Sequence, residues 1–303
     1  MKKIIYFGPL FIIIAAFLWA LDGIVLRPAL YTLPVSLVVL VEHGLAFLFM
    51  LPFFIKEFGE VKKLKRRDWG AFLWVAIFGG ALGTIFITKA LFYVDFVNLS
   101  IVVLIQKLQP VFALLLASLI LKERLPKKFF GWAVLAIAAT YFVTFDGLVP
   151  NLATGDKTAI AALFALGAAF AWGSSTVFGK RALAQVDFRV GTYLRFGLTT
   201  LIMLGIALVT KDIFALPAIN PGQWLIFLII VFSSGGAAMF LYYYGLKRVT
   251  ASVSTICELA FPLSAIFLEF AIRGRVLSLT QWLGAIVLMF AIYQVSLLQR
   301  PQN

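Results

Sequence analysis

Ten apolar runs, each about as long as a membrane-crossing helix, limit the possible fold of this sequence more than any other feature. A transmembrane helix needs about 20 predominantly apolar residues. Of the 303 residues, 63% are hydrophobic and only 13% are charged, so we predict an all-α polytopic membrane protein of the inner or plasma membrane. The ten expected transmembrane helices cover residues 6–26, 33–55, 69–91, 97–121, 129–145, 159–178, 190–210, 223–246, 250–271 and 280–298.

The basic residues indicate how these helices cross the membrane. Lys and Arg concentrate in short cytoplasmic loops, so their positions predict topology. With a cytoplasmic N-terminus, 18 of the 26 Lys and Arg residues fall in inside segments and 6 in outside segments, while Lys107 and Arg195 lie within spans. We therefore expect cytoplasmic N- and C-termini. The net charge of +13 is then a topology signal, and no nucleic-acid partner is expected.

The two halves of the chain resemble each other at an offset of about 153 residues. The sequence AFLW at 16–19 matches AFAW at 169–172, and Pro110 matches Pro262. Each half holds five expected spans, and because five is odd, the second half enters the membrane from the opposite side. Inverted-topology repeats are typical of secondary transporters. The predicted units are a first repeat at 1–147, an outer linker at 148–157 and a second repeat at 158–303.

These motifs resemble those of a known family, the EamA-type ten-helix members of the drug/metabolite transporter superfamily. The resemblance rests on AFxW at 16–19 and 169–172, on PVFA at 110–113 and on LKERL at 121–125. The second half departs from the family at 273–275, where Arg-Gly-Arg replaces the usual glutamate before the last helix. The resemblance implies two inverted five-helix repeats. Relatives are thought to move amino acids, nucleosides, drugs and other metabolites.

Polar residues inside two proline-containing runs are the first candidate substrate contacts. An ionisable side chain at membrane depth costs roughly 2.5–3.5 kcal/mol, so it should face protein or a polar cavity. Gln106 and Glu258 each lie four residues before a proline, where a helix is expected to kink, and Lys107 follows Gln106. We expect Lys107 to bind an anionic group and Glu258 a cationic group or a proton. The alternative is that the two charges neutralise each other in a packed core.

A second set of polar residues lies in the second and seventh spans. Glu42 and Arg195 occupy equivalent positions in the two repeats, and they are expected to form either an ion pair that joins the halves or two substrate contacts. Asp22, near the outer end of the first span, is interpreted as reaching interfacial water. His43 is the only histidine and a candidate proton carrier. The candidates for proton coupling are therefore Glu42, Glu258 and His43.

Aromatic residues complete the predicted site. Trp19 and Trp172 are paired by the repeat and are expected either to pack or to line the cavity and stack on a ring. The three tyrosines at 242–244 suggest an interfacial belt, with one ring, that of Tyr242, turned inward. The glycines at 79, 80 and 83, the pair at 235–236 and Gly167 predict either close helix packing or points where helices flex. The predicted substrate-binding residues are Lys107, Gln106, Glu258, Trp19, Trp172, Arg195, Glu42 and Tyr242.

These features predict a secondary-active transporter, an exporter of a small polar metabolite such as an amino acid. It would work by alternating access around a central cavity, as a monomer or homodimer in the lipid bilayer. With one Cys, Cys257, and one His, no metal site, cofactor or catalytic residue is expected. The alternatives are a membrane-embedded enzyme such as a lipid-modifying transferase, or a non-transporting membrane sensor. The enzyme would need a cluster of catalytic groups, and the sensor a soluble output domain.

Overall fold

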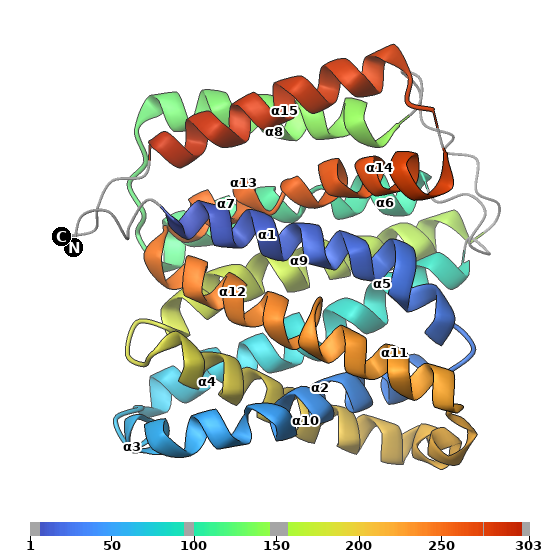
Figure 1. The fold of residues 1–303 in the computed structure, drawn as a ribbon. Coiled ribbons are helices and arrows are strands. Elements are labelled where there is room, and N and C mark those ends of the chain that lie inside the picture. Colours follow the sequence, from blue (N-terminus) through green and yellow to red (C-terminus); the bar gives the residue numbers. More distant parts are fainter. Residues whose placement is uncertain (1–6, 94–99, 146–156, 275, 299–303) are drawn as a thin grey trace.

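A computed structural model describes residues 7–93, 100–145, 157–274 and 276–298, and within these residues every regular element is helical. The helices form a layered bundle with roughly parallel axes (Figure 1). The elements of the first half are α1 (Gly8–Leu21), η2 (Asp22–Leu26), η3 (Arg27–Leu30), α2 (Val35–Phe54), η4 (Ile55–Glu57), α3 (Phe58–Val61), α4 (Arg66–Trp74), η5 (Val75–Leu82), α5 (Gly83–Tyr93), α6 (Ser100–Gln106), α7 (Gln109–Ile120) and α8 (Lys127–Thr144). The second half has α9 (Thr158–Ala182), α10 (Phe188–Val209), η6 (Asp212–Ala218), α11 (Pro221–Phe232), α12 (Gly236–Arg248), α13 (Ala251–Cys257), α14 (Ala260–Arg273) and α15 (Leu279–Leu297).

Nine helical segments among the described residues are long and apolar enough to cross a membrane. Helix α8 occupies the place of the predicted fifth span but is not among them. Its 18 residues begin with Lys127 and Lys128, and these two charges lower the average hydropathy of the whole helix. The polytopic helical class therefore holds, while the count of ten spans stays a prediction.

Equivalent helices of the two halves run in opposite directions. In Figure 1, α6 and α7 run from right to left, whereas α13 and α14 run from left to right. Helices α8 and α15, the last of each half, pack against each other. The start of α1 and the end of α15 lie at the same end of the bundle (Figure 1). This is the arrangement that an inverted repeat produces, although the side on which the termini lie is still a prediction.

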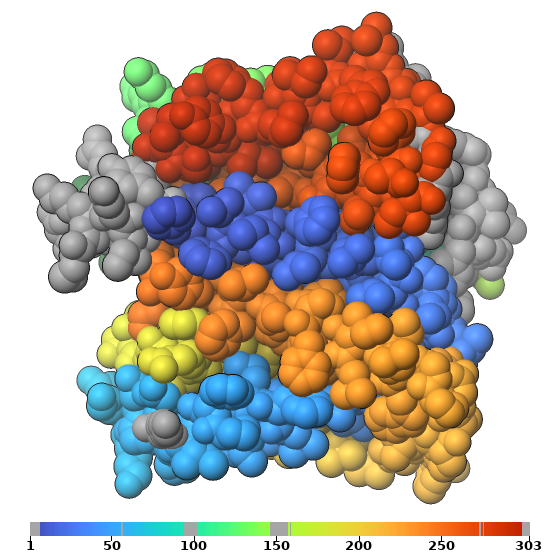
Figure 2. Space-filling model, in the orientation of Figure 1, coloured from blue at the N-terminus to red at the C-terminus, as the bar shows by residue number. Residues whose placement is uncertain are grey.

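Small residues let the helices approach closely. Helix α1 fills the space between α12 and α14, and Figure 2 shows this face closed. A Cβ atom on Gly80 would lie 2.3 Å from Thr199 Oγ1, and one on Gly83 would lie 2.4 Å from Trp172 Nε1. Because lipid provides no strong hydrophobic driving force between helices, such close packing is a main source of helix–helix association. The close approach predicted for these glycines is confirmed.

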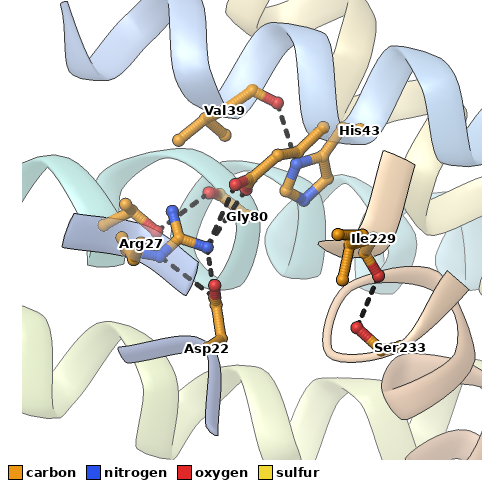
Figure 3. A network of polar contacts seen from close by, with 9 residues as sticks. Asp22, Arg27, Val39, His43, Gly80, Ile229 and Ser233 are labelled. Atoms are coloured by element: carbon orange, nitrogen blue, oxygen red, sulfur yellow. Dashed lines mark hydrogen bonds and ion pairs between the residues drawn. The ribbon is translucent and has the colours of Figure 1, made fainter. Parts of the chain in front are cut away.

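Two equivalent spans also depart from regular α-helix at equivalent places. The third span contains the π-helical segment η5, and the eighth is interrupted at Ser233–Gly235 between α11 and α12. Ser233 Oγ donates a hydrogen bond of 2.5 Å to the Ile229 carbonyl at this interruption (Figure 3). At membrane depth, the N–H and C=O groups of irregular backbone need hydrogen bonds from other protein groups. Polar side chains therefore gather near such segments.

Candidate substrate-binding site

The fourth and ninth spans are both interrupted where the sequence predicts a kink. Helix α6 ends at Gln106 and α7 begins at Gln109, while α13 ends at Cys257 and α14 begins at Ala260. A proline has no N–H to donate to the carbonyl four residues earlier, so Pro110 and Pro262 each remove one helical hydrogen bond. Both predicted kinks are confirmed, and they place Lys107 and Glu258 at the two interruptions.

Glu258 is held by a cluster of uncharged donors, which we call the Glu258 cluster. Tyr242 donates from its hydroxyl to Oε1 at 2.8 Å, and Gln109 donates from Nε2 to Oε2 at 2.9 Å. The hydroxyls of Ser254 and Thr176 donate to Oε1 at 3.1 and 3.4 Å. Hydrogen bonds to a charged acceptor are about twice as strong as neutral ones. The carboxylate is thus satisfied without a cationic partner.

Both halves of the chain build this cluster. Gln109 comes from α7 in the first half, whereas Thr176 and Tyr242 come from α9 and α12 in the second. Trp19, on α1, adds an aromatic wall, since its ring centre lies 5.2 Å from that of Tyr242. The cluster therefore lies where the halves meet, as expected of a transporter site built from repeats.

Two rings of the tyrosine run at 242–244 are buried, where the sequence predicts one. Tyr242 and Tyr243 are 5% and 1% exposed. Tyr243 links the Glu258 cluster to Arg195, because its ring lies 5.9 Å from that of Tyr242 and 5.8 Å from the Arg195 guanidinium carbon. Tyr242 is turned inward as predicted, and the interfacial belt is wrong for Tyr243, because α12 turns both rings toward α1, α9 and α10.

Lys107 does not pair with Glu258, although the sequence places the two at equivalent interruptions. Its ammonium nitrogen lies 5.5 Å from the centre of the Phe261 ring, within the range of a cation–π contact. Gln106 is half-buried at the end of α6. Trp172, on α9, lies against Gly83. Of the predicted residues, the contacts thus connect Trp19, Tyr242, Glu258 and Arg195 into one group, and leave Lys107, Gln106 and Trp172 beside it.

Glu42 and Arg195 do not form the expected ion pair. Glu42 instead lies 3.1 Å from the guanidinium of Arg27, which also pairs with Asp22 at 2.5 Å (Figure 3). Helices α2 and α10 do pack together, but the Arg195 side chain reaches the Gly79 carbonyl at 3.4 Å. The repeat alignment therefore identified a pair of helices that pack together, α2 and α10. The directions of their side chains determine that Glu42 and Arg195 contact other groups.

Asp22 and His43 are also placed by these contacts. Asp22 is 7% exposed and paired with Arg27, so the interpretation that it reaches interfacial water is wrong. Nδ1 of His43 lies 3.0 Å from the Val39 carbonyl (Figure 3). The His43 ring packs against Phe196, with the ring centres 5.3 Å apart. A carbonyl only accepts, so Nδ1 carries the proton in this contact.

Some of these residues were not predicted from the sequence as site residues. Gln109 belongs to the same proline motif as Lys107, and Ser254 lies four residues before Glu258, on the same helix face. Both therefore carry a local sequence signal. Thr176 and Arg27 carry none, because their contacts depend on how distant segments pack.

An apolar cavity of about 630 Å³ lies elsewhere, between α2, α10 and α12. It is lined mainly by aromatic and small apolar side chains, among them Phe53, which is 72% exposed. Such a surface suits lipid chains, whereas a polar solute needs a few convergent polar groups. The Glu258 cluster is therefore the better candidate site.

The apolar helices, which surround a buried polar cluster built from both halves of the chain, define a multi-pass membrane protein, and the cluster is its candidate solute site. The model of the EamA-like transporter family matches residues 6–145 and again residues 159–297, and the chain belongs to this family. It is a membrane transporter and not an enzyme.

Two curated relatives and one solved structure are similar to the chain. The riboflavin transporter ImpX of Fusobacterium nucleatum subsp. nucleatum is 43% identical over 290 residues, which cover 95% of this chain and 97% of the relative. An uncharacterized transporter of Synechocystis sp. is 28% identical over 245 residues, which cover 76% of this chain and 66% of that protein. A crystal structure with 16% identity superposes with a TM-score of 0.71 over 96% of this chain and 98% of that one, which supports the fold alone.

Proposed function

We propose that the chain transports riboflavin, or a similar flat polar ring compound, and that the Glu258 cluster binds it. The observation that carries this proposal is the 43% identity to a riboflavin transporter over 95% of the chain. The composition of the cluster agrees with it. The flavin ring system is flat, and its edge carries an imide N–H between carbonyl groups.

The chemistry of the cluster matches such a ring edge. The carboxylate of Glu258 is an acceptor for an N–H, while Gln109 and Tyr242 carry donors suited to carbonyl oxygens. Trp19 supplies an aromatic face beside them. Alternating access would expose this cluster to each side in turn as the two repeats rock against each other.

The amino-acid substrate and the exporter direction that the sequence predicts are finer statements that stay proposals. Lys107, which has no carboxylate within ion-pair distance among the described residues, favours a solute with an anionic group. A thermal-shift screen of amino acids against wild type and Lys107→Ala tests this second candidate. Stabilisation of wild type alone by an amino acid would favour it over riboflavin. The sign of net flux in oriented vesicles tests export.

Quenching of flavin fluorescence by the purified full chain tests the riboflavin proposal directly. Glu258→Gln removes the charged acceptor, and because such bonds contribute about 1.5–3 kcal/mol, riboflavin affinity should fall by about 10- to 100-fold. Trp19→Ala should also weaken binding. The matched controls are Glu57→Gln, which changes an acid that pairs with Arg189, and Trp282→Ala, which removes an exposed ring. Equal affinities for Glu258→Gln and Glu57→Gln would place riboflavin elsewhere.

A further inference from the structure

Two buried acids and one partly buried arginine form a separate group, which we call the Arg27 triad. Asp22 begins η2, Arg27 begins η3, and Glu42 lies on α2. The Arg27 guanidinium contacts both acids, and Figure 3 shows it beside Asp22. Asp22 and Glu42 are only 7% and 8% exposed. None of the three takes part in the hydrogen bonds of the Glu258 cluster.

The Arg27 triad lacks one positive charge. It holds two carboxylates and one guanidinium, and two of its buried oxygens, Asp22 Oδ1 and Glu42 Oε1, accept no hydrogen bond. A buried charge without compensation is strongly unfavourable. An added proton on one carboxyl would remove the excess charge.

The surrounding helices do not supply the missing charge. Helix α11, which packs on η2, has no titratable residue, and π-helical η5 has none either. Arg195 on α10 contacts Gly79 and Tyr243 instead of the triad. The remaining titratable residues with described side chains lie on α2 itself and on the helices that pack against η2 or α2. They are His43 on α2, Glu57 on η4, Lys89 and Tyr93 on α5, Arg189 and Tyr193 on α10, Asp212 on η6, and Glu269 on α14.

We propose that the Arg27 triad is a proton-binding site that couples transport to a proton gradient, and that Glu42 takes up the proton. Asp22 is the tighter partner, since both Nε and Nη2 of Arg27 bond to it, at 3.0 and 2.5 Å. Glu42 is reached by Nη2 alone, at 3.1 and 3.3 Å from its two oxygens. Protonation of Glu42 therefore removes the excess charge and leaves the Asp22–Arg27 pair intact.

A proton fits this group better than a metal ion. Hard cations take several oxygen ligands around one centre. Here the guanidinium already occupies the space between the two carboxylates. The side chain of Arg27 is 28% exposed, so the group reaches the surface of the protein at the end of the first span.

The position of the Arg27 triad explains how a proton would affect movement. The Arg27–Glu42 contact ties the irregular segment at residues 22–30 to α2. Once Glu42 is protonated, this tie loses its ionic attraction, and the segment can move relative to α2. Single π-helical turns of the kind seen at η2 are frequent at functional sites. Proton binding would thus bias the position of one end of the first span.

Transport assays in vesicles test this inference, which rests on the proposed function because riboflavin flux is the readout. For one proton per solute, a pH difference of one unit supports about a tenfold riboflavin gradient. Wild type should accumulate riboflavin toward that limit. Glu42→Gln, which mimics the protonated acid, should retain riboflavin exchange without a gradient and lose pH-driven accumulation. The exposed helix-capping variant Asp68→Asn should match wild type in both assays.

Asp22→Asn separates coupling from a purely structural role. Without the Asp22 charge, Arg27 pairs with Glu42 alone, so Glu42 holds its proton less tightly. The pH at which proton drive is half-maximal should then move to lower values, whereas a structural defect would lower the rate equally at every pH. Exchange without any response to the pH gradient in wild type, or drive by sodium alone, would overturn the proton site and leave the proposed function standing.

A measurement without substrate keeps the inference testable if riboflavin is not exchanged, an outcome that would contradict the proposed function alone. Infrared difference spectra of the purified full chain, recorded between about pH 5 and 9, should show a protonated-carboxyl band that titrates. Glu42→Gln should lack this band and Asp68→Asn should keep it. A spectrum in which Glu42→Gln retains the full band would rule out Glu42 as the proton acceptor.

Discussion

At the scale of single residues, the structure separates two kinds of buried acid. Glu258 accepts hydrogen bonds from four uncharged side chains, whereas Glu42 contacts a guanidinium that it shares with Asp22. Neutral donors can be exchanged for those of a ligand without leaving a buried cation unpaired. Breaking an ion pair would leave the partner charge uncompensated. The first arrangement therefore suits substrate binding, and the second suits proton binding.

Tyr242→Phe isolates one hydrogen bond of the Glu258 cluster. The variant keeps the ring beside Trp19 and removes the hydroxyl that donates to Glu258 at 2.8 Å. Hydrogen bonds to charged groups contribute about 1.5–3 kcal/mol. We therefore expect riboflavin affinity to fall by about tenfold or more in a fluorescence titration. Tyr293→Phe, which alters a ring that is 57% exposed, is the control. Unchanged affinity in both variants would exclude the Tyr242 hydroxyl from the site.

At the scale of helices, the sequence marked the interruptions that contain a proline or a glycine pair, and it did not mark η2. Pro110 and Pro262 mark the breaks in the fourth and ninth spans because proline removes a backbone donor. The π-helical segments η2 and η5 contain no proline. They depend on the packing of side chains from distant helices, as with Thr199 against Gly80. The glycine pairs at 79–80 and 235–236 mark η5 and the break at Ser233–Gly235 as places of close packing or flexing, whereas no local sequence signal marks η2.

The candidate site was predicted in the same uneven way. Glu258 and Trp19 were singled out because polar or aromatic residues at repeated positions within apolar runs are unusual, and Tyr242 because it begins a run of three tyrosines. The pairing of Arg27 with both Asp22 and Glu42 was missed, since it depends on the turn of the chain after α1. The repeat alignment relates backbone positions only. A side chain at one position has several partners within reach, so the alignment does not determine which contact forms.

A pair of glycine substitutions tests the packing of the third span. Gly80→Ala would place a methyl group 2.3 Å from Thr199 Oγ1 and 2.5 Å from its Cγ2. Overpacking of this kind typically destabilises by about 1–3 kcal/mol, so the midpoint of thermal unfolding in detergent should fall. Gly70→Ala, on α4, meets no atom within 4 Å and should be neutral or raise the midpoint slightly. Equal midpoints for the two variants would show that Gly80 on η5 and Thr199 on α10 lie further apart than the structure places them.

At the scale of the whole molecule, contacts between the halves hold one end of the bundle together. Glu123, in the LKERL motif after α7, accepts hydrogen bonds from the backbone N–H groups of Ala251 and Ser252 at 2.7 and 3.1 Å. The Ser252 hydroxyl also donates to it, at 2.6 Å. One carboxylate of the first half thus caps the start of α13 in the second, and α13 leads directly to Glu258. Any rocking of the halves that opens this end must break these bonds.

Glu123→Ala should therefore make the site easier to reach from the end of the bundle where Glu123 lies. Cys257, the only cysteine of the chain, is fully buried and precedes Glu258, so its labelling by a maleimide reports such opening. Loss of hydrogen bonds to a charged acceptor, each contributing about 1.5–3 kcal/mol, should speed labelling by about tenfold or more. Riboflavin should slow it again by binding next to Cys257. Asp68→Asn, which changes another capping acid at the start of α4, is the control. Labelling at the wild-type rate in Glu123→Ala would mean that other contacts keep this end closed, and that the Glu123 bonds only cap α13.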